Sequence, residues 1–159
     1  MISIKILAID QATKNSGFCL IDSSTKEIKA FGTLQADEKK KTELRIHDLK
    51  SWLEKTIIKE AVDLVLIEDI QFQRNYKVYK TLAQLQGVLI EMCVANNIKY
   101  KVVASATWKS RVGIQQTKRA EEKKRSIIIA SEVVGEDVHE DTADAICMVL
   151  SELMGSDKQ

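Results

Sequence analysis

Proline is absent from this sequence, and neither an internal repeat nor a low-complexity stretch marks a linker between domains. The chain has 159 residues, of which 45% are hydrophobic, and this is enough to bury one sizeable core. We therefore expect a single domain over residues 1–159, without an internal boundary.

Long apolar runs are missing as well. No stretch approaches the roughly 20 residues that a helix needs to span a bilayer. The first five residues, Met1 to Lys5, lack the basic start and the apolar stretch of a signal peptide. We expect a soluble protein of the cytoplasm that has no membrane partner.

Cysteine is scarce and odd in number. Cys19, Cys93 and Cys147 are far apart in the sequence, and each stands among apolar residues. This pattern favours small core side chains over disulfides, zinc ligands or a catalytic nucleophile.

The chain also lacks a large excess of charge of one sign. Its net charge of +1 by itself argues against a nucleic-acid-binding protein, but the charges are separated along the chain. Residues 99–125 carry nine Lys or Arg against two Glu, and residues 126–159 carry eight acids against one Lys. A further basic stretch contains Arg74, Lys77 and Lys80 without an acid. Such segments can neutralise DNA phosphates, although residues 118–125 could equally form a solvated helix face.

Hydrophobic periodicity predicts alternating strands and helices. Short apolar runs rich in β-branched residues predict strands over residues 4–9, 17–22, 27–34, 63–67 and 100–103. Helical spacing predicts helices over residues 39–60, 76–96, 117–134 and 142–154. We expect an α/β fold in which helices flank a five-stranded mixed sheet.

Four carboxylates occupy positions that such a fold can bring together. Asp10 closes the first strand and Glu68 the fourth, and the carboxyl ends of neighbouring parallel strands lie about 4.8 Å apart. Asp141 and Asp144 share one face of the last helix. Each acid alone has an ordinary explanation as a turn, cap or helix-dipole residue. Together they predict a site for Mg²⁺ or Mn²⁺, because no Cys or paired His is near enough to favour zinc.

The order of these elements and acids resembles the ribonuclease H-like nuclease superfamily and, within it, the RuvC family of Holliday junction resolvases. The resemblance is carried by residues 9–10 with 16–17, 67–70, 82–88, 108–113 and 141–145. It implies a ribonuclease H-like fold and a crossover junction endodeoxyribonuclease that resolves four-way DNA junctions, and potentially other branched DNA, by paired Mg²⁺-dependent cuts. It also implies a homodimer, for which the helix over residues 76–96 is the candidate interface; a purely internal packing role for that helix is the alternative.

The resemblance assigns roles to individual residues. Asp10, Glu68, Asp141 and Asp144 correspond to the four metal-binding acids of the family, which would hold two Mg²⁺ ions, or Mn²⁺ in their place. Lys109 corresponds to a basic catalytic residue near the scissile phosphate, and a plain surface lysine that contacts phosphate is the alternative for it and for Lys118. With the basic segments included, the expected DNA contacts are Phe72, Arg74, Lys77, Lys80, Lys109, Arg111, Lys118 and Arg119.

Some positions depart from the family pattern. Gln11 and Ala12 stand where many members have Pro-Gly after the first aspartate, so we expect a different turn there. The segment between Gly113 and Lys123 aligns loosely, which leaves the role of Lys118 and any cutting-sequence preference open. Phe72 stands one residue further from Glu68 than the aromatic that some members insert at the junction centre, and a core or lid position is its alternative.

Two other functions are compatible with the sequence. One is a non-catalytic protein that binds branched DNA, against which the complete set of four acids argues. The other is a ribonuclease H-like nuclease acting on RNA or RNA-DNA hybrids. His139, just before the last helix, is more simply explained as a surface histidine than as a residue that activates water.

Overall fold

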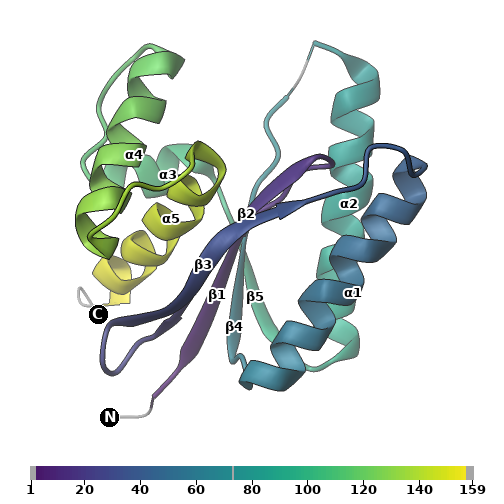
Figure 1. Cartoon of the computed structure of the whole chain (residues 1–159), viewed down its shortest axis with the longest axis horizontal. Helices are drawn as coiled ribbons and strands as arrows, with labels where there is room; N and C mark the ends of the chain where they lie inside the picture. The colour runs from purple at the N-terminus through teal and green to yellow at the C-terminus, as the bar shows by residue number, and fades with distance from the viewer. Residues whose placement is uncertain (1–2, 73, 157–159) are drawn as a thin grey trace.

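The structure, a computed structural model, describes residues 3–72 and 74–156. Its centre is one sheet in the order β3-β2-β1-β4-β5 (Figure 1). The strands are β1 (Lys5–Asp10), β2 (Asn15–Asp22), β3 (Glu27–Gln35), β4 (Leu64–Glu68) and β5 (Lys99–Val103). β1, β2 and β3 form an antiparallel meander, whereas β4 runs parallel to both β1 and β5. The predicted five-stranded mixed sheet is therefore confirmed.

Helices cover both faces of the sheet. α1 (Thr42–Glu60) and α2 (Tyr76–Ala95) lie on one face, and α3 (Ser105–Arg111), α4 (Arg119–Val134) and α5 (Glu140–Ser156) lie on the other (Figure 1). Alternate residues of one strand enter different cores: in β1, Leu7 and Ile9 pack toward α1 and α2, and Ile6 and Ala8 pack toward α3, α4 and α5. Burial on both faces explains why β1 and β4 read as almost continuous apolar runs.

The predicted strands and four of the five helices agree with the structure within a few residues at their ends. α3 was not predicted, because a helix of seven residues is too short to show an apolar period. Cys19, Cys93 and Cys147 are buried free thiols, as expected. Within residues 3–72 and 74–156, no helix is long and apolar enough to cross a membrane.

Candidate active site

The four predicted acids come from three elements and line one cavity. Asp10 and Glu68 are the last residues of β1 and β4, which pair in parallel up to Ile9 and Ile67. Asp141 and Asp144 lie in the first two turns of α5. The cavity has a volume of about 160 Å³, and its wall also contains Arg119, Lys123 and Glu140.

A glycine allows α5 to approach the sheet closely enough to deliver its two acids. Gly17 pairs with Asp10 across the β1–β2 ladder, and a Cβ atom on Gly17 would lie 1.6 Å from the backbone oxygen of Asp141. Next to this contact, the hydroxyls of Thr33 in β3 and Thr142 in α5 are hydrogen bonded at 2.8 Å. The start of α5 is thus fixed against β2 and β3 by direct backbone packing.

Burial and mutual repulsion make the acids hard to ionise together. The pKa of Asp10 is raised well above its ordinary value, first by burial and then by the charges of Glu68, Asp144 and Asp141. Burial, followed by the charge of Asp144, raises the pKa of Glu68 to about 7. Burial also raises the pKa values of Asp141 and Asp144. Such a cluster favours a bound cation, which would offset the repulsion between the carboxylates.

Two buried side chains orient two of the acids. The indole N–H of Trp108, in α3, donates a hydrogen bond of 2.7 Å to Oε2 of Glu68. The hydroxyl of Ser126, in α4, donates a hydrogen bond of 2.8 Å to Oδ1 of Asp144. Both bonds lower the pKa of their acceptor and partly oppose the effect of burial. Neither residue was predicted to belong to the site.

The donor set suits a hard divalent cation, because four carboxylates with no thiolate beside them supply only oxygen ligands. The side chains are gathered around the cavity rather than closed on one point. In the part of the chain that the structure describes, no group of three or more Asp, Glu, His or Cys is already arranged to hold a metal ion. Ionised carboxylates at this distance repel one another, and a bound cation would offset that repulsion.

The basic residues predicted to contact DNA divide into groups. Lys109 and Arg119 line a neighbouring cavity of about 370 Å³ together with Glu68 and Asp144. Lys123, which was not predicted, lines both cavities. Lys118 is the N-cap residue of α4 and is not among the residues that line either cavity.

A second group surrounds the start of α2. Phe72 is 82% exposed, which removes a core position as its alternative, and its ring centroid lies 5.7 Å from that of Tyr79. Arg74, Lys77 and Lys80 are exposed nearby in the sequence. Arg111 lies elsewhere: its guanidinium is close to Gly155, about 20 Å along α5 from Asp141. The structure therefore does not bring Arg111 to the acids.

His139 precedes α5, and its side chain is 62% exposed. Its Nδ1 accepts a hydrogen bond from the backbone N–H of Asp141 and lies 3.2 Å from Oδ2 of the same residue. These contacts agree with a surface histidine that stabilises the start of the helix.

A family model described as "Crossover junction endodeoxyribonuclease RuvC" matches residues 6–152. This chain belongs to the RuvC family. A RuvC protein from Caldicellulosiruptor saccharolyticus is 26% identical over 159 aligned positions, which cover 96% of this chain and 94% of the relative. Another, from Syntrophomonas wolfei, is 31% identical over 97 residues, which cover 60% of this chain and 56% of the relative.

Solved structures of Holliday junction resolvases share the fold. RuvC from Thermus thermophilus, in complex with a Holliday junction substrate, superposes with a TM-score of 0.81 at 9% identity, covering 98% of this chain and 96% of that chain. The yeast mitochondrial Holliday junction resolvase superposes with a TM-score of 0.68 at 15% identity, covering 98% and 80%. The predicted ribonuclease H-like fold is confirmed, and the RuvC family consists of metal-dependent nucleases.

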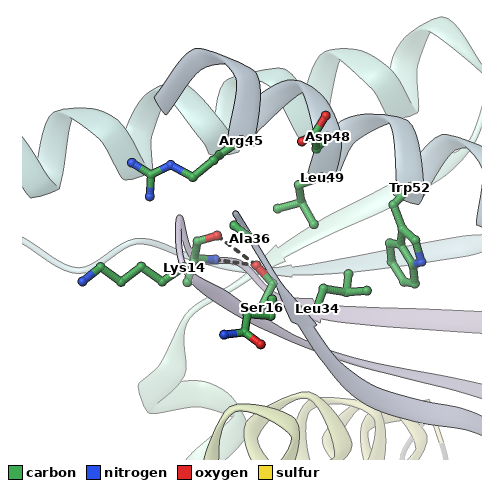
Figure 2. Close-up of a pocket in the computed structure, with 10 residues that line it drawn as sticks. Lys14, Ser16, Leu34, Ala36, Arg45, Asp48, Leu49 and Trp52 are labelled. Carbon is green, nitrogen blue, oxygen red and sulfur yellow. Dashed lines mark hydrogen bonds between the residues drawn. The ribbon is translucent and has the colours of Figure 1, made fainter. Parts of the chain in front are cut away.

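The turn that departs from the RuvC pattern is held by side chains instead of by Pro-Gly. The hydroxyl of Ser16 accepts a hydrogen bond from the backbone N–H of Ala12 and donates one to the carbonyl oxygen of the same residue, both at 2.9 Å. Figure 2 draws these bonds as dashed lines beside Ser16. Arg45 of α1 donates a hydrogen bond of 3.1 Å to the carbonyl oxygen of Thr13. The cavity drawn there, about 210 Å³, has Leu34, Leu49 and Trp52 in its wall but none of the four acids, so it is separate from the candidate active site.

The raised pKa of Glu68 predicts a pH-dependent stability for the metal-free protein. The ordinary pKa of 4.5 rises to about 7 on folding, so the folded state keeps a proton that the unfolded chain loses in this range. The free energy of unfolding should therefore fall as the pH rises from about 4.5 to about 7. Glu68→Gln should lose less stability than the wild type between about pH 5 and about pH 8 in thermal melts with EDTA. Equal losses in the two proteins would contradict this prediction.

Proposed function

We propose that this chain cuts four-way DNA junctions, and other branched DNA with them, as a metal-dependent endodeoxyribonuclease whose single domain comprises residues 1–159. The supporting observation is that Asp10, Glu68, Asp141 and Asp144 line one cavity, with Lys109, Arg119 and Lys123 beside them. The Thermus thermophilus RuvC structure, which shares the fold, contains a Holliday junction.

The four acids would hold Mg²⁺, or Mn²⁺ in its place, with two ions in each active site. When bound, the ions would activate the attacking water and stabilise the leaving oxygen. Trp108 and Ser126 keep Glu68 and Asp144 oriented through their hydrogen bonds. Lys109 would contact the scissile phosphate, and its positive charge already favours the ionised forms of Asp10, Glu68 and Asp144 by lowering their pKa values.

DNA would approach between two elements that stand on either side of the carboxyl ends of β1 and β4 (Figure 1). The start of α2 offers the exposed ring of Phe72 with Arg74, Lys77 and Lys80. The start of α4 offers Lys118, Arg119 and Lys123, all exposed. Aromatic rings can stack on unpaired bases at the centre of a branch, while the cations neutralise phosphates of the arms.

A C2 homodimer would supply the two active sites that paired incision of a two-fold symmetric junction requires. α2 is our candidate interface, because it buries Leu85, Leu89, Met92 and Cys93 on one side and still exposes the apolar side chains of Val88 and Val94. A groove lined by Gly87, Val88 and Met92 runs along α2 where it meets α1.

Analytical ultracentrifugation at micromolar concentration without DNA should show a dimer, and Val88→Lys should shift it toward monomer, since a buried charge without a partner opposes association. Val133→Lys, on the exposed side of α4, is the matched control and should leave the dimer intact. A wild type that sediments only as a monomer would rule out this assembly.

The function is tested with labelled four-way junction, fork, duplex and RNA-DNA hybrid substrates incubated with Mg²⁺ or Mn²⁺. We expect paired cuts in the junction with 5′ phosphate and 3′ hydroxyl ends, and little cutting of duplex. Cutting of the hybrid in preference to the junction would favour the ribonuclease alternative. Junction binding without cutting in either metal would favour a non-catalytic protein.

A further inference from the structure

A half-buried ion pair lies beside the four acids. Nζ of Lys109 is 2.8 Å from Oε2 of Glu122, and the two side chains are only 23% and 24% exposed. Lys109 belongs to α3 and Glu122 to the first turn of α4. Both residues line the cavity of about 370 Å³ that also includes Glu68 and Asp144. The pair therefore joins two helices in the wall of the candidate active site.

Glu122 differs from the four acids because it does not line the cavity that all four share and because its carboxylate is paired with a lysine. The smaller cavity, into which all four acids open, has no contribution from Glu122 among the described residues that line it. Its carboxylate instead accepts a hydrogen bond from Lys109. The ion pair with Lys109 is therefore the interaction through which Glu122 can affect the site.

The surroundings of Lys109 restrict a side chain that is otherwise mobile. A lysine ammonium has three donors on a flexible four-carbon stem, so one fixed partner leaves two donors free. The Nζ atom of Lys109 also lies 5.6 Å from the ring centroid of Trp108. Trp108 is fully buried and donates to Glu68. The ammonium of Lys109 is thus held between the indole ring of Trp108, which is hydrogen bonded to Glu68, and the carboxylate of Glu122 on α4.

We propose that Glu122 is a positioning residue for DNA cleavage, which holds the ammonium of Lys109 at the edge of the acid cavity with two donors free for the scissile phosphate. This rests on the proposed function, because it requires a phosphate at that cavity. Glu122 also repels the approaching DNA, since its carboxylate lies beside Lys109 in the wall of the neighbouring cavity of about 370 Å³. It therefore increases the cleavage rate while it weakens binding.

Opposite effects on rate and on binding distinguish this role from a structural one. With enzyme in excess over a labelled four-way junction, Glu122→Gln should lower the cleavage rate constant about tenfold, because the ammonium is no longer held in place. The Kd for the junction should stay unchanged or fall by about twofold, since one repelling charge is lost. A general distortion of α4 would weaken both rate and binding.

Glu121 provides the matched control. It lies in the same turn of α4 and is exposed, so Glu121→Gln makes the same change of charge without touching Lys109. We expect it to cut at the wild-type rate. Glu122→Asp, which keeps the charge on a shorter stem, should recover part of the rate that Glu122→Gln loses.

A double-mutant cycle tests whether Glu122 acts through Lys109. Lys109→Met removes the ammonium but keeps a stem of similar length, and adding Glu122→Gln to it should change the rate by less than about twofold. The proposal is overturned if Glu122→Gln behaves like Glu121→Gln, or if its tenfold loss persists in the Lys109→Met background.

A measurement without DNA separates this proposal from the proposed function. Proton-nitrogen NMR of the lysine ammonium groups should show a protected signal for Lys109, assigned with Lys109→Met, that disappears in Glu122→Gln and remains in Glu121→Gln. A protected signal that survives in Glu122→Gln overturns the positioning role, even in an active nuclease. If the wild type cuts no junction in Mg²⁺ or Mn²⁺, the proposed function fails, and the role of Glu122 in cleavage fails with it.

Discussion

Asp10→Asn should abolish junction cleavage while junction binding persists. The charges of all three other acids raise the pKa of Asp10, and its carboxyl group lines the same cavity as theirs. Asn has nearly the same shape but is neutral and offers one weak oxygen ligand, so the variant would no longer hold the metal correctly. We expect the cleavage rate constant to fall by at least about 10³-fold, as for the loss of a group that acts directly on the transition state.

The affinity of Asp10→Asn for the junction should change far less than its cleavage rate. Phosphate contacts by basic residues supply most of the affinity for DNA, whereas the negative charge of Asp10 repels phosphates and adds nothing to that affinity. The Kd of Asp10→Asn for a four-way junction should therefore stay within about threefold of the wild-type value. Single-turnover cleavage and fluorescence anisotropy measure the two quantities. Asp137→Asn, an exposed acid just before α5, is the control and should cut normally.

The same variant has a consequence for stability. A buried carboxylate with a raised pKa destabilises the metal-free fold near neutral pH, so Asp10→Asn should melt at a higher temperature than the wild type in EDTA. Adding Mg²⁺ should stabilise the wild type more than the variant, because the binding energy of the cation is lost with the ligand. An Asp10→Asn protein that cuts junctions at the wild-type rate would remove Asp10 from the catalytic set.

The candidate site was predictable where local patterns determine position. Asp10 and Glu68 each follow a short apolar run, and acids at the ends of adjacent parallel strands must lie close together. The spacing of Asp141 and Asp144 placed both on one side of a helix. The grouping of these four acids could be predicted because each position depends on the end of a strand or on the helical period. The family pattern has its acids in the same order along the chain.

The residues that sequence reasoning missed depend on contacts between distant segments. Trp108 lies 40 positions from its acceptor Glu68, and Ser126 lies 18 positions from Asp144. α3 carries Trp108 and Lys109 but is too short to show a period. Lys123 lines the acid cavity, because the rotation of α4 about its axis turns it inward, whereas Lys118 precedes the helix in extended backbone and does not line it. Only tertiary packing sets that rotation.

Among the six Gly→Ala changes that this chain allows, Gly17→Ala should have the largest effect on packing, because its added Cβ would make the shortest contact. The added Cβ would lie 1.6 Å from the backbone oxygen of Asp141 and 2.4 Å from its carbonyl carbon. Neither atom can rotate away, so the first turn of α5 would have to move by roughly 1.4 Å from a close-packed sheet. That movement would stretch the hydrogen bond between Thr33 and Thr142 and displace Asp141 itself.

We expect Gly17→Ala to lower the free energy of unfolding by about 3 kcal/mol or more, and the folded fraction to cut at least about 100-fold more slowly, because the acids of α5 are misplaced. Gly32→Ala is the matched control: Gly32 lies in the neighbouring strand, and its Cβ would meet only the ring of Phe18, at 3.1 Å. A ring can turn, so the loss there should stay below about 1.5 kcal/mol with cleavage retained. Urea unfolding followed by circular dichroism, with cleavage assays on the same preparations, measures both. If the two variants lose the same stability, then α5 does not depend on Gly17 for its approach, and another contact must hold Asp141 and Asp144 over the sheet.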